Sequence, residues 1–107
     1  MEKEMLKGSI DLLILSLLRK KDLYGYEIVQ LVHELSDGAY EMSEGTLYAA
    51  LKRIERKNWV ESYWVEGSGQ RRKYYRLTDK GGETAEEKLE SWNRVDALIR
   101  KTAEGYR

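Results

Sequence analysis

The segment from residue 43 to residue 81 constrains the fold of this 107-residue chain more than any other. Its first part repeats apolar residues at helical spacing after Ser43, a residue type favoured at helix N-termini. Residues 59–65 are aromatic and β-branched, which is typical of a strand. Residues 67–70 (GSGQ) supply a turn, and residues 72–77 predict the returning strand. We therefore expect a helix followed directly by a β-hairpin.

The two sides of this expected helix have different chemistry. One side is apolar and faces the core through Leu47, Ala50, Leu51 and Ile54. The other side carries Gly45, Ala49, Lys52 and Arg56, with Tyr48 and Arg53 on its flanks. Small residues let a helix approach a surface closely, and the long cations then reach phosphates or base edges.

The neutral net charge hides a local excess of positive charge. The whole chain has 19 Lys or Arg and 19 Asp or Glu, but residues 43–76 contain eight basic and four acidic residues. Residues 1–42 are net acidic. Because salt screens charges beyond about 8–10 Å, DNA responds to the local field rather than to the total. The basic segment favours DNA binding; a solvated basic face without a partner is the alternative.

Helices are also expected on both sides of this segment. Residues 4–20 are apolar on two sides, so one side needs a further partner, such as another subunit. A second helix at 24–36 places on one stripe Ile28, Leu31, Val32 and Leu35. A last helix at 78–103 is mostly polar, with a thin stripe of Ala85, Leu89, Trp92, Val95 and Ile99. Such a helix is typical of a dimerisation arm.

These elements predict one compact unit of the α+β class, mainly α. Residues 1–77 form a winged helix-turn-helix, and residues 78–107 form a long C-terminal dimerisation helix. A two-stranded hairpin is marginal alone, so the wing must lean on the helices.

The composition argues against an enzyme, a metal site and a membrane protein. There is no Cys, one His, and no Gly-rich phosphate loop followed by Lys, so we expect neither catalysis nor a metal or other cofactor. No run of 18 apolar residues exists, and Glu2 and Glu4 lie where a signal peptide would be positive. We expect a cytoplasmic protein with no membrane partner.

Several motifs, taken together in this order, carry a resemblance to a known family. They are residues 24–28 (YGYEI), 45–48 (GTLY), 51–55 (LKRIE) and 71–81 (RRKYYRLTDKG). With the last helix they cover nearly the whole chain, which resembles the PadR family of bacterial transcription regulators. Ala49 is a departure, since many members have Pro there; we expect the same fold with a less rigid first turn.

The interpretation that follows is a homodimeric repressor on a palindromic double-stranded DNA operator, with half-sites about one helical turn apart. Phosphate contacts are expected from Lys57, Arg71, Arg72 and Lys73. Base contacts are expected from Tyr48, Lys52 and Arg53. The other predicted DNA-binding residues are Ser43, Thr46, Arg56 and Gln70.

Alternatives to these contacts stay open. Tyr48 could instead pack on the second helix, and the basic face could bind an acidic protein. Trp59, Trp64 and Tyr75 are assigned to the core of the hairpin rather than to DNA.

Residues 90–96 (ESWNRVD) resemble a compact subgroup of the family with a single C-terminal helix. That resemblance implies a homodimer and, for the multidrug-responsive repressor in the subgroup, flat aromatic compounds held between paired tryptophans. A two-fold axis near Trp92 would set two indoles face to face, and Asp96 in the apolar stripe would favour a cationic ligand. The predicted ligand-binding residues are Gly8, Leu12, Leu15, Leu89, Trp92, Val95 and Asp96. The alternative is that the stripe simply packs the dimer.

Overall fold

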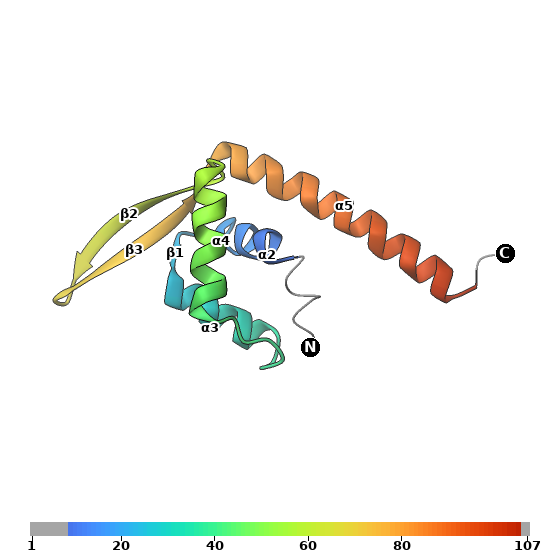
Figure 1. Ribbon diagram of the computed structural model, residues 1–107, viewed down its shortest axis with the longest axis horizontal. Coiled ribbons are helices and arrows are strands. Elements are labelled where there is room, and N and C mark those ends of the chain that lie inside the picture. Colours follow the sequence, from blue (N-terminus) through green and yellow to red (C-terminus); the bar gives the residue numbers. More distant parts are fainter. Residues whose placement is uncertain (1–8, 106–107) are drawn as a thin grey trace.

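A computed structural model describes residues 9–105 of the chain and has the shape of a helical body with two projections (Figure 1). The body contains α2 (Ile10–Leu18), β1 (Leu23–Tyr24), α3 (Gly25–Leu35) and α4 (Glu44–Arg56). The hairpin of β2 (Val60–Gly67) and β3 (Gln70–Leu77) projects on one side, and α5 (Asp79–Ala103) projects on the other. The predicted class, a mainly helical α+β winged helix-turn-helix with a long C-terminal helix, is confirmed.

The sheet has three antiparallel strands in the order β1-β3-β2, one more than the sequence predicted. Leu23 pairs with Tyr75 and Tyr24 pairs with Tyr74. A two-residue strand is too short to show the alternation by which a strand is predicted, which is why β1 was missed. Its effect is structural, because it attaches the wing to the start of α3.

The hairpin turn occurs where the sequence predicted it. Ser68 and Gly69 both have positive φ, at 52° and 78°, as a two-residue type I′ turn requires. This turn matches the natural twist of the strands, so the pairing continues without interruption from Val60 opposite Leu77 to Gly67 opposite Gln70.

The core lies where α2, α3 and α4 meet the base of the sheet. The four inward residues of α4 are buried as predicted, and Ile14, Leu15 and Ile28 are fully enclosed beside them. The prediction for the second helix was partly wrong: Ile28 and Val32 are buried, but Leu35 is 71% exposed. Leu35 is the last residue of α3, beyond the reach of the core.

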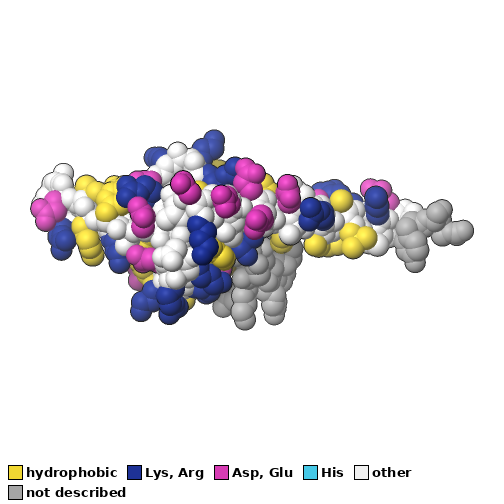
Figure 2. All heavy atoms as spheres, turned by 90° about the horizontal axis from the view of Figure 1, so that it is seen from above, with side chains coloured by type: hydrophobic (Ala, Val, Ile, Leu, Met, Phe, Trp, Pro, Cys, Tyr) yellow, Lys and Arg dark blue, Asp and Glu magenta, His cyan; other side chains and the backbone are white. Residues whose placement is uncertain are grey.

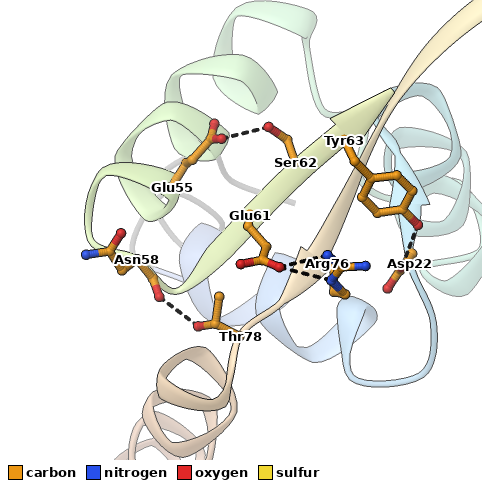
Figure 3. Close-up of polar contacts among 8 residues, drawn as sticks. All are labelled: Asp22, Glu55, Asn58, Glu61, Ser62, Tyr63, Arg76 and Thr78. Carbon is orange, nitrogen blue, oxygen red and sulfur yellow. Dashed lines mark hydrogen bonds and ion pairs between the residues drawn. The ribbon is translucent and has the colours of Figure 1, made fainter. Parts of the chain in front are cut away.

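Hydrogen bonds at the helix starts fix α4 and α5. The Ser43 hydroxyl accepts the Thr46 N–H at 3.1 Å, and the Thr78 hydroxyl accepts the Gly81 N–H at 3.0 Å. Thr78 also donates to the backbone carbonyl of Asn58 at 2.7 Å (Figure 3). The beginning of α5 is therefore joined to the end of α4.

Beyond that joint, α5 extends away from the body (Figure 1). Only Gly81 and Ala85 of its 25 residues are buried. The whole chain measures 62 × 30 × 21 Å, with a radius of gyration of 15.7 Å against about 13 Å for a compact domain of 100 residues. None of the helices within residues 9–105 combines the length and apolar character needed to cross a bilayer.

Candidate DNA-binding surface and interface groove

The outward face of α4 is open to solvent. Gly45, Ala49, Lys52 and Arg56 are exposed, as the sequence predicted. The other exposed residues around this helix that were predicted to bind DNA are Ser43, Thr46 and Lys57. Because Gly45 and Ala49 have no long side chains, the helix backbone can come close to another surface, with the cations beside it.

Tyr48 packs on α3 with one part of its side chain and leaves the rest exposed. Its side chain is 47% exposed on the flank of α4. Its hydroxyl also lies against Gly25 at the start of α3, where a Cβ on Gly25 would be 2.5 Å from the Tyr48 oxygen. A glycine in the YGYEI motif therefore makes room for this tyrosine, and the remaining half of the ring is accessible.

Arg53, predicted to read bases, is paired with Asp11 of α2 and keeps its side chain 42% exposed. Its guanidinium donates from Nη2 to Asp11 Oδ1 at 2.6 Å and from Nε to Asp11 Oδ2 at 3.2 Å. This hydrogen bond and the carboxylate charge raise the pKa of Arg53. Arg53 therefore joins α4 to α2.

The two faces of the wing carry different sets of residues. Side chains alternate along a strand, so Arg71 and Lys73 lie on one face and Arg72 on the other. Arg71 is stacked 4.4 Å from the centre of the Trp64 ring, while Arg72 is stacked 4.8 Å from the centre of the Tyr24 ring. Arg71, Arg72 and Gln70 are exposed, and Lys73 is half-buried.

The assignment of the hairpin aromatics to the core was right for two residues and wrong for one. Tyr75 is buried, and Trp59 packs against the core. Trp64 is 53% exposed. Trp64 is in the outer half of β2, and its ring is contacted by Arg71 and Lys73 of β3 rather than enclosed in the core.

Side chains on the face of the wing that carries Arg72 contact one another and the body. Tyr63 donates a short hydrogen bond to Asp22, which raises the pKa of the tyrosine (Figure 3). Arg76 donates to Glu61 at 2.8 Å, and Tyr24 meets the Tyr74 ring edge-on at 5.3 Å. The bond to Asp22 attaches the wing to the loop before β1, and the contact between Tyr24 and Tyr74 attaches it to β1 itself.

An apolar groove lies between α2, the end of α3 and α5. Its volume is about 500 Å³, and its apolar lining includes Leu12, Leu13, Leu17, Leu35, Leu89 and Trp92. A second hollow of about 630 Å³ shares Leu12 and Trp92 and adds Asp11, Arg53, Lys88 and Val95. Leu12, Leu89, Trp92 and Val95 are thus brought together as predicted.

The other predicted ligand residues are placed differently. Leu15 is fully buried in the core, so the prediction that it lines a ligand site is wrong. Gly8 lies outside the described residues. Asp96 accepts a hydrogen bond from Arg100 Nε at 3.0 Å, which satisfies the carboxylate within α5.

The apolar stripe of α5 is open along the arm. Exposed fractions are 39% for Leu89, 50% for Trp92, 53% for Val95 and 58% for Ile99. Leu98, which the sequence pattern did not place on the stripe, is 62% exposed. Leu98 is one position off the predicted stripe, which is why periodicity did not include it. Apolar side chains are visible on the arm in Figure 2.

Comparison with known proteins identifies the family. The model of the PadR-like family of transcriptional regulators matches residues 14–87, which run from α2 into α5. The chain belongs to the PadR-like family. An uncharacterised protein of Lysinibacillus sphaericus is 37% identical over 103 residues, covering 95% of this chain and 94% of the relative. A member of this family regulates transcription, so the chain is a regulator and not an enzyme.

Solved structures of PadR-like regulators have the same fold. A transcriptional regulator from Clostridium thermocellum is 37% identical with a TM-score of 0.86, covering 92% of this chain and 97% of its own. A PadR family regulator from Clostridium difficile R20291 is 44% identical with a TM-score of 0.81, covering 90% and 99%. Bacillus subtilis PadR in complex with operator DNA is 27% identical with a TM-score of 0.67, covering 75% of this chain and 46% of that chain.

Proposed function

We propose that this PadR-like regulator is a homodimeric repressor that binds a palindromic operator through α4 and the wing. The observation that carries the proposal is the exposed face of α4, where Gly45 and Ala49 leave the backbone accessible and Lys52 and Arg56 follow on the same face. The likeness to Bacillus subtilis PadR, solved in complex with operator DNA, supports DNA binding by this chain. Each α4 would enter one major groove, with half-sites about one helical turn apart.

A salt titration tests the DNA proposal. The upstream region of the regulator's own gene and a random duplex of equal length are titrated by gel shift. We expect tighter binding to the upstream region and a linear fall of log affinity with log salt, because phosphate contacts release counterions. Equal affinity for both duplexes would refute the repressor. Binding to an acidic protein but to neither duplex would favour an interaction module.

We further propose that a flat aromatic cation modulates the dimer from the groove beside Trp92. The apolar groove of about 500 Å³ has the size and lining of a small-molecule site. Leu89 and Val95 would flank a ring stacked on Trp92. Occupation would alter the spacing of the two α4 helices, and coupling energies of about 1–3 kcal/mol are typical of such linkage. A regulator without a ligand is the alternative, in which this stripe only packs the dimer.

Dye binding tests the ligand proposal. A planar cationic dye is titrated while tryptophan fluorescence is followed, and Trp92→Ala is expected to abolish the quenching. Binding by Trp92→Ala equal to that of the parent would exclude this site. Asp96→Asn should weaken a cationic dye more than a neutral one; since Arg100 already pairs with Asp96, the difference should be modest. If Asp96→Asn weakens both dyes equally, the Asp96 charge has no role in ligand binding.

A further inference from the structure

The wing carries an exposed tryptophan for which the fold gives no packing role. Trp64 is in the outer half of β2, and its side chain is 53% exposed. Indoles are large apolar groups that usually bury most of their surface or contact a partner. The other aromatic residues of the hairpin, Tyr63, Tyr74 and Tyr75, all have partners in the body or the sheet.

Trp64 is on the face of the hairpin that is turned toward α4. Residues i and i+2 of a strand share a face, so Trp64 lies on the same side as Ser62. Ser62 donates a hydrogen bond to Glu55 of α4 at 2.7 Å (Figure 3), and Tyr75, opposite Ser62, is buried against the body. Trp64 therefore extends the surface of α4 outward along the wing.

Two cations are gathered over the Trp64 ring. The guanidinium carbon of Arg71 is 4.4 Å from the ring centre. The Lys73 ammonium is 5.9 Å from it and 5.8 Å from the centre of the Tyr75 ring. Lys73 is directly opposite Trp64 in the ladder, and Arg71 is its diagonal neighbour, within reach of an aromatic side chain. A cation over an indole face is held by the ring quadrupole.

The ring differs from a carboxylate in what it does to the cation. Arg71 also approaches Glu66, with 3.5 Å between Nε and Oε2, but both of these side chains are largely exposed. An exposed ion pair of this kind contributes little to stability. Its carboxylate also offsets the positive charge that attracts phosphate. Trp64 restrains the guanidinium without adding a negative charge beside it.

The cations of the opposite face also lie over aromatic rings, but those rings attach the wing to the body. Arg76 is bonded to Glu61 and lies 4.9 Å from the Tyr63 ring, and Arg72 lies over Tyr24. Tyr63 and Tyr24 in turn belong to the contacts that attach the wing to the loop before β1 and to α3. That face holds the wing on the body, whereas the Trp64 face presents charge beside α4.

We propose that Trp64 is a positioning residue for DNA binding: its ring holds Arg71 and Lys73 on the α4 side of the wing, ready to contact phosphates. This inference rests on the proposed DNA-binding function. An arginine fixed before contact loses less side-chain entropy when it binds phosphate, so the ring increases affinity for any sequence.

The test is the affinity and its salt dependence for a random duplex. Trp64→Ala is expected to weaken binding by about 2- to 10-fold, the cost of ordering a long side chain when it binds. It should also reduce the slope of log affinity against log salt by about 0.9 for each phosphate that the protein no longer neutralises. Trp64→Phe keeps an aromatic face and should retain most of the affinity. The matched control is Val65→Ala, which truncates an exposed apolar residue on the other face of the same strand.

Two further variants separate positioning from other roles. Trp64→Leu keeps an apolar side chain without a π face, so it should bind as weakly as Trp64→Ala. In an Arg71→Ala and Lys73→Ala background, Trp64→Ala should cost little more, because the residues through which it acts are gone. Full affinity in Trp64→Leu, or an undiminished effect of Trp64→Ala in that background, would overturn the inference. Circular dichroism confirms that each variant compared is folded.

The outcome also distinguishes this inference from the proposed function. If the parent protein binds no duplex at low salt, DNA binding itself fails, and the role of Trp64 fails with it. If the parent binds and Trp64→Ala binds equally well with the same salt slope, only the inference about Trp64 is wrong.

Discussion

Gly81 and Gly82, two adjacent glycines near the start of α5, differ in the space available for a side chain. A Cβ on Gly81 would lie 2.8 Å from the carbonyl carbon of Trp59 and 2.9 Å from a Leu77 methyl group, and the Trp59 oxygen is nearer still. A Cβ on Gly82 would meet only a Leu77 methyl group at 3.8 Å, which is ordinary contact. The end of α4, the sheet and the start of α5 are therefore pressed together at Gly81.

Gly81→Ala should consequently destabilise the protein, and Gly82→Ala should not. Overpacking typically costs about 1–3 kcal/mol, which exceeds the helix propensity of about 1 kcal/mol gained on replacing Gly by Ala. Gly82→Ala should gain the helix propensity without overpacking any neighbour. Urea denaturation of both variants, at one protein concentration, gives the two free energies of unfolding. A Gly81→Ala variant as stable as Gly82→Ala would mean that the joint can relax.

Residue by residue, the sequence was most informative where periodicity and helix capping determine position. It predicted the buried stripe of α4 and the caps at Ser43 and Thr78. It did not show the contact of Arg53 with Asp11, and it wrongly placed Trp64 in the core, because both environments depend on contacts between elements. The Asp11 carboxylate on α2 and the distance of the wing from the body decide those environments, and neither can be read from a local pattern.

At the scale of elements, Asp11 and Arg53 connect α2 to α4. Both hydrogen bonds of this pair are charge-assisted, and the Asp11 side chain is only 19% exposed. The pair also borders the hollow that contains Trp92. The orientation of α4, and hence of its exposed face, depends on this contact with the helix that forms one wall of the groove.

Asp11→Asn should therefore lower the free energy of unfolding by about 1–2 kcal/mol, because hydrogen bonds to charged groups contribute on this order. The control is Glu90→Gln, the same change of carboxylate to amide in an exposed pair of α5, where Glu90 and Arg94 approach to 3.6 Å with both side chains more than 70% exposed. That variant should stay within about 0.5 kcal/mol of the parent. Equal effects in thermal or urea unfolding would show that the link between α2 and α4 is no stronger than a surface pair.

The boundaries of helices and strands were predicted where local sequence signals determine them, and missed where tertiary contacts do. The helix α5 begins and ends almost where the sequence indicated, because a cap precedes it and its stripe is long. The strand β1 was missed because its two residues pair only through the tertiary fold. For the groove, Leu12, Leu89 and Trp92 were found from helical faces, whereas Leu13, Leu17 and Leu35 line it because α2, α3 and α5 converge.

At the scale of the molecule, the arm is too long for one subunit to cover. A helix of 25 residues extends about 37 Å, and only its first two turns have buried residues. Leu89, Trp92, Val95 and Ile99 form one continuous exposed stripe beyond those turns. Exposed apolar surface of this extent on a projecting helix indicates association, and a second copy of the chain offers the matching stripe.

Ile99→Glu should therefore convert the proposed dimer to a monomer without unfolding the body. Ile99 is 58% exposed within the subunit, so the change disturbs no core packing, but a dimer would have to bury the new carboxylate. Ala97→Glu is the matched control, since Ala97 is exposed on the opposite side of α5 and the same charge is introduced. Light scattering gives the mass of each, and circular dichroism the helix content. A monomeric Ile99→Glu should also bind operator DNA more weakly, because one subunit contacts one half-site. If Ile99→Glu remains dimeric like Ala97→Glu, the α5 stripe is not the dimer interface.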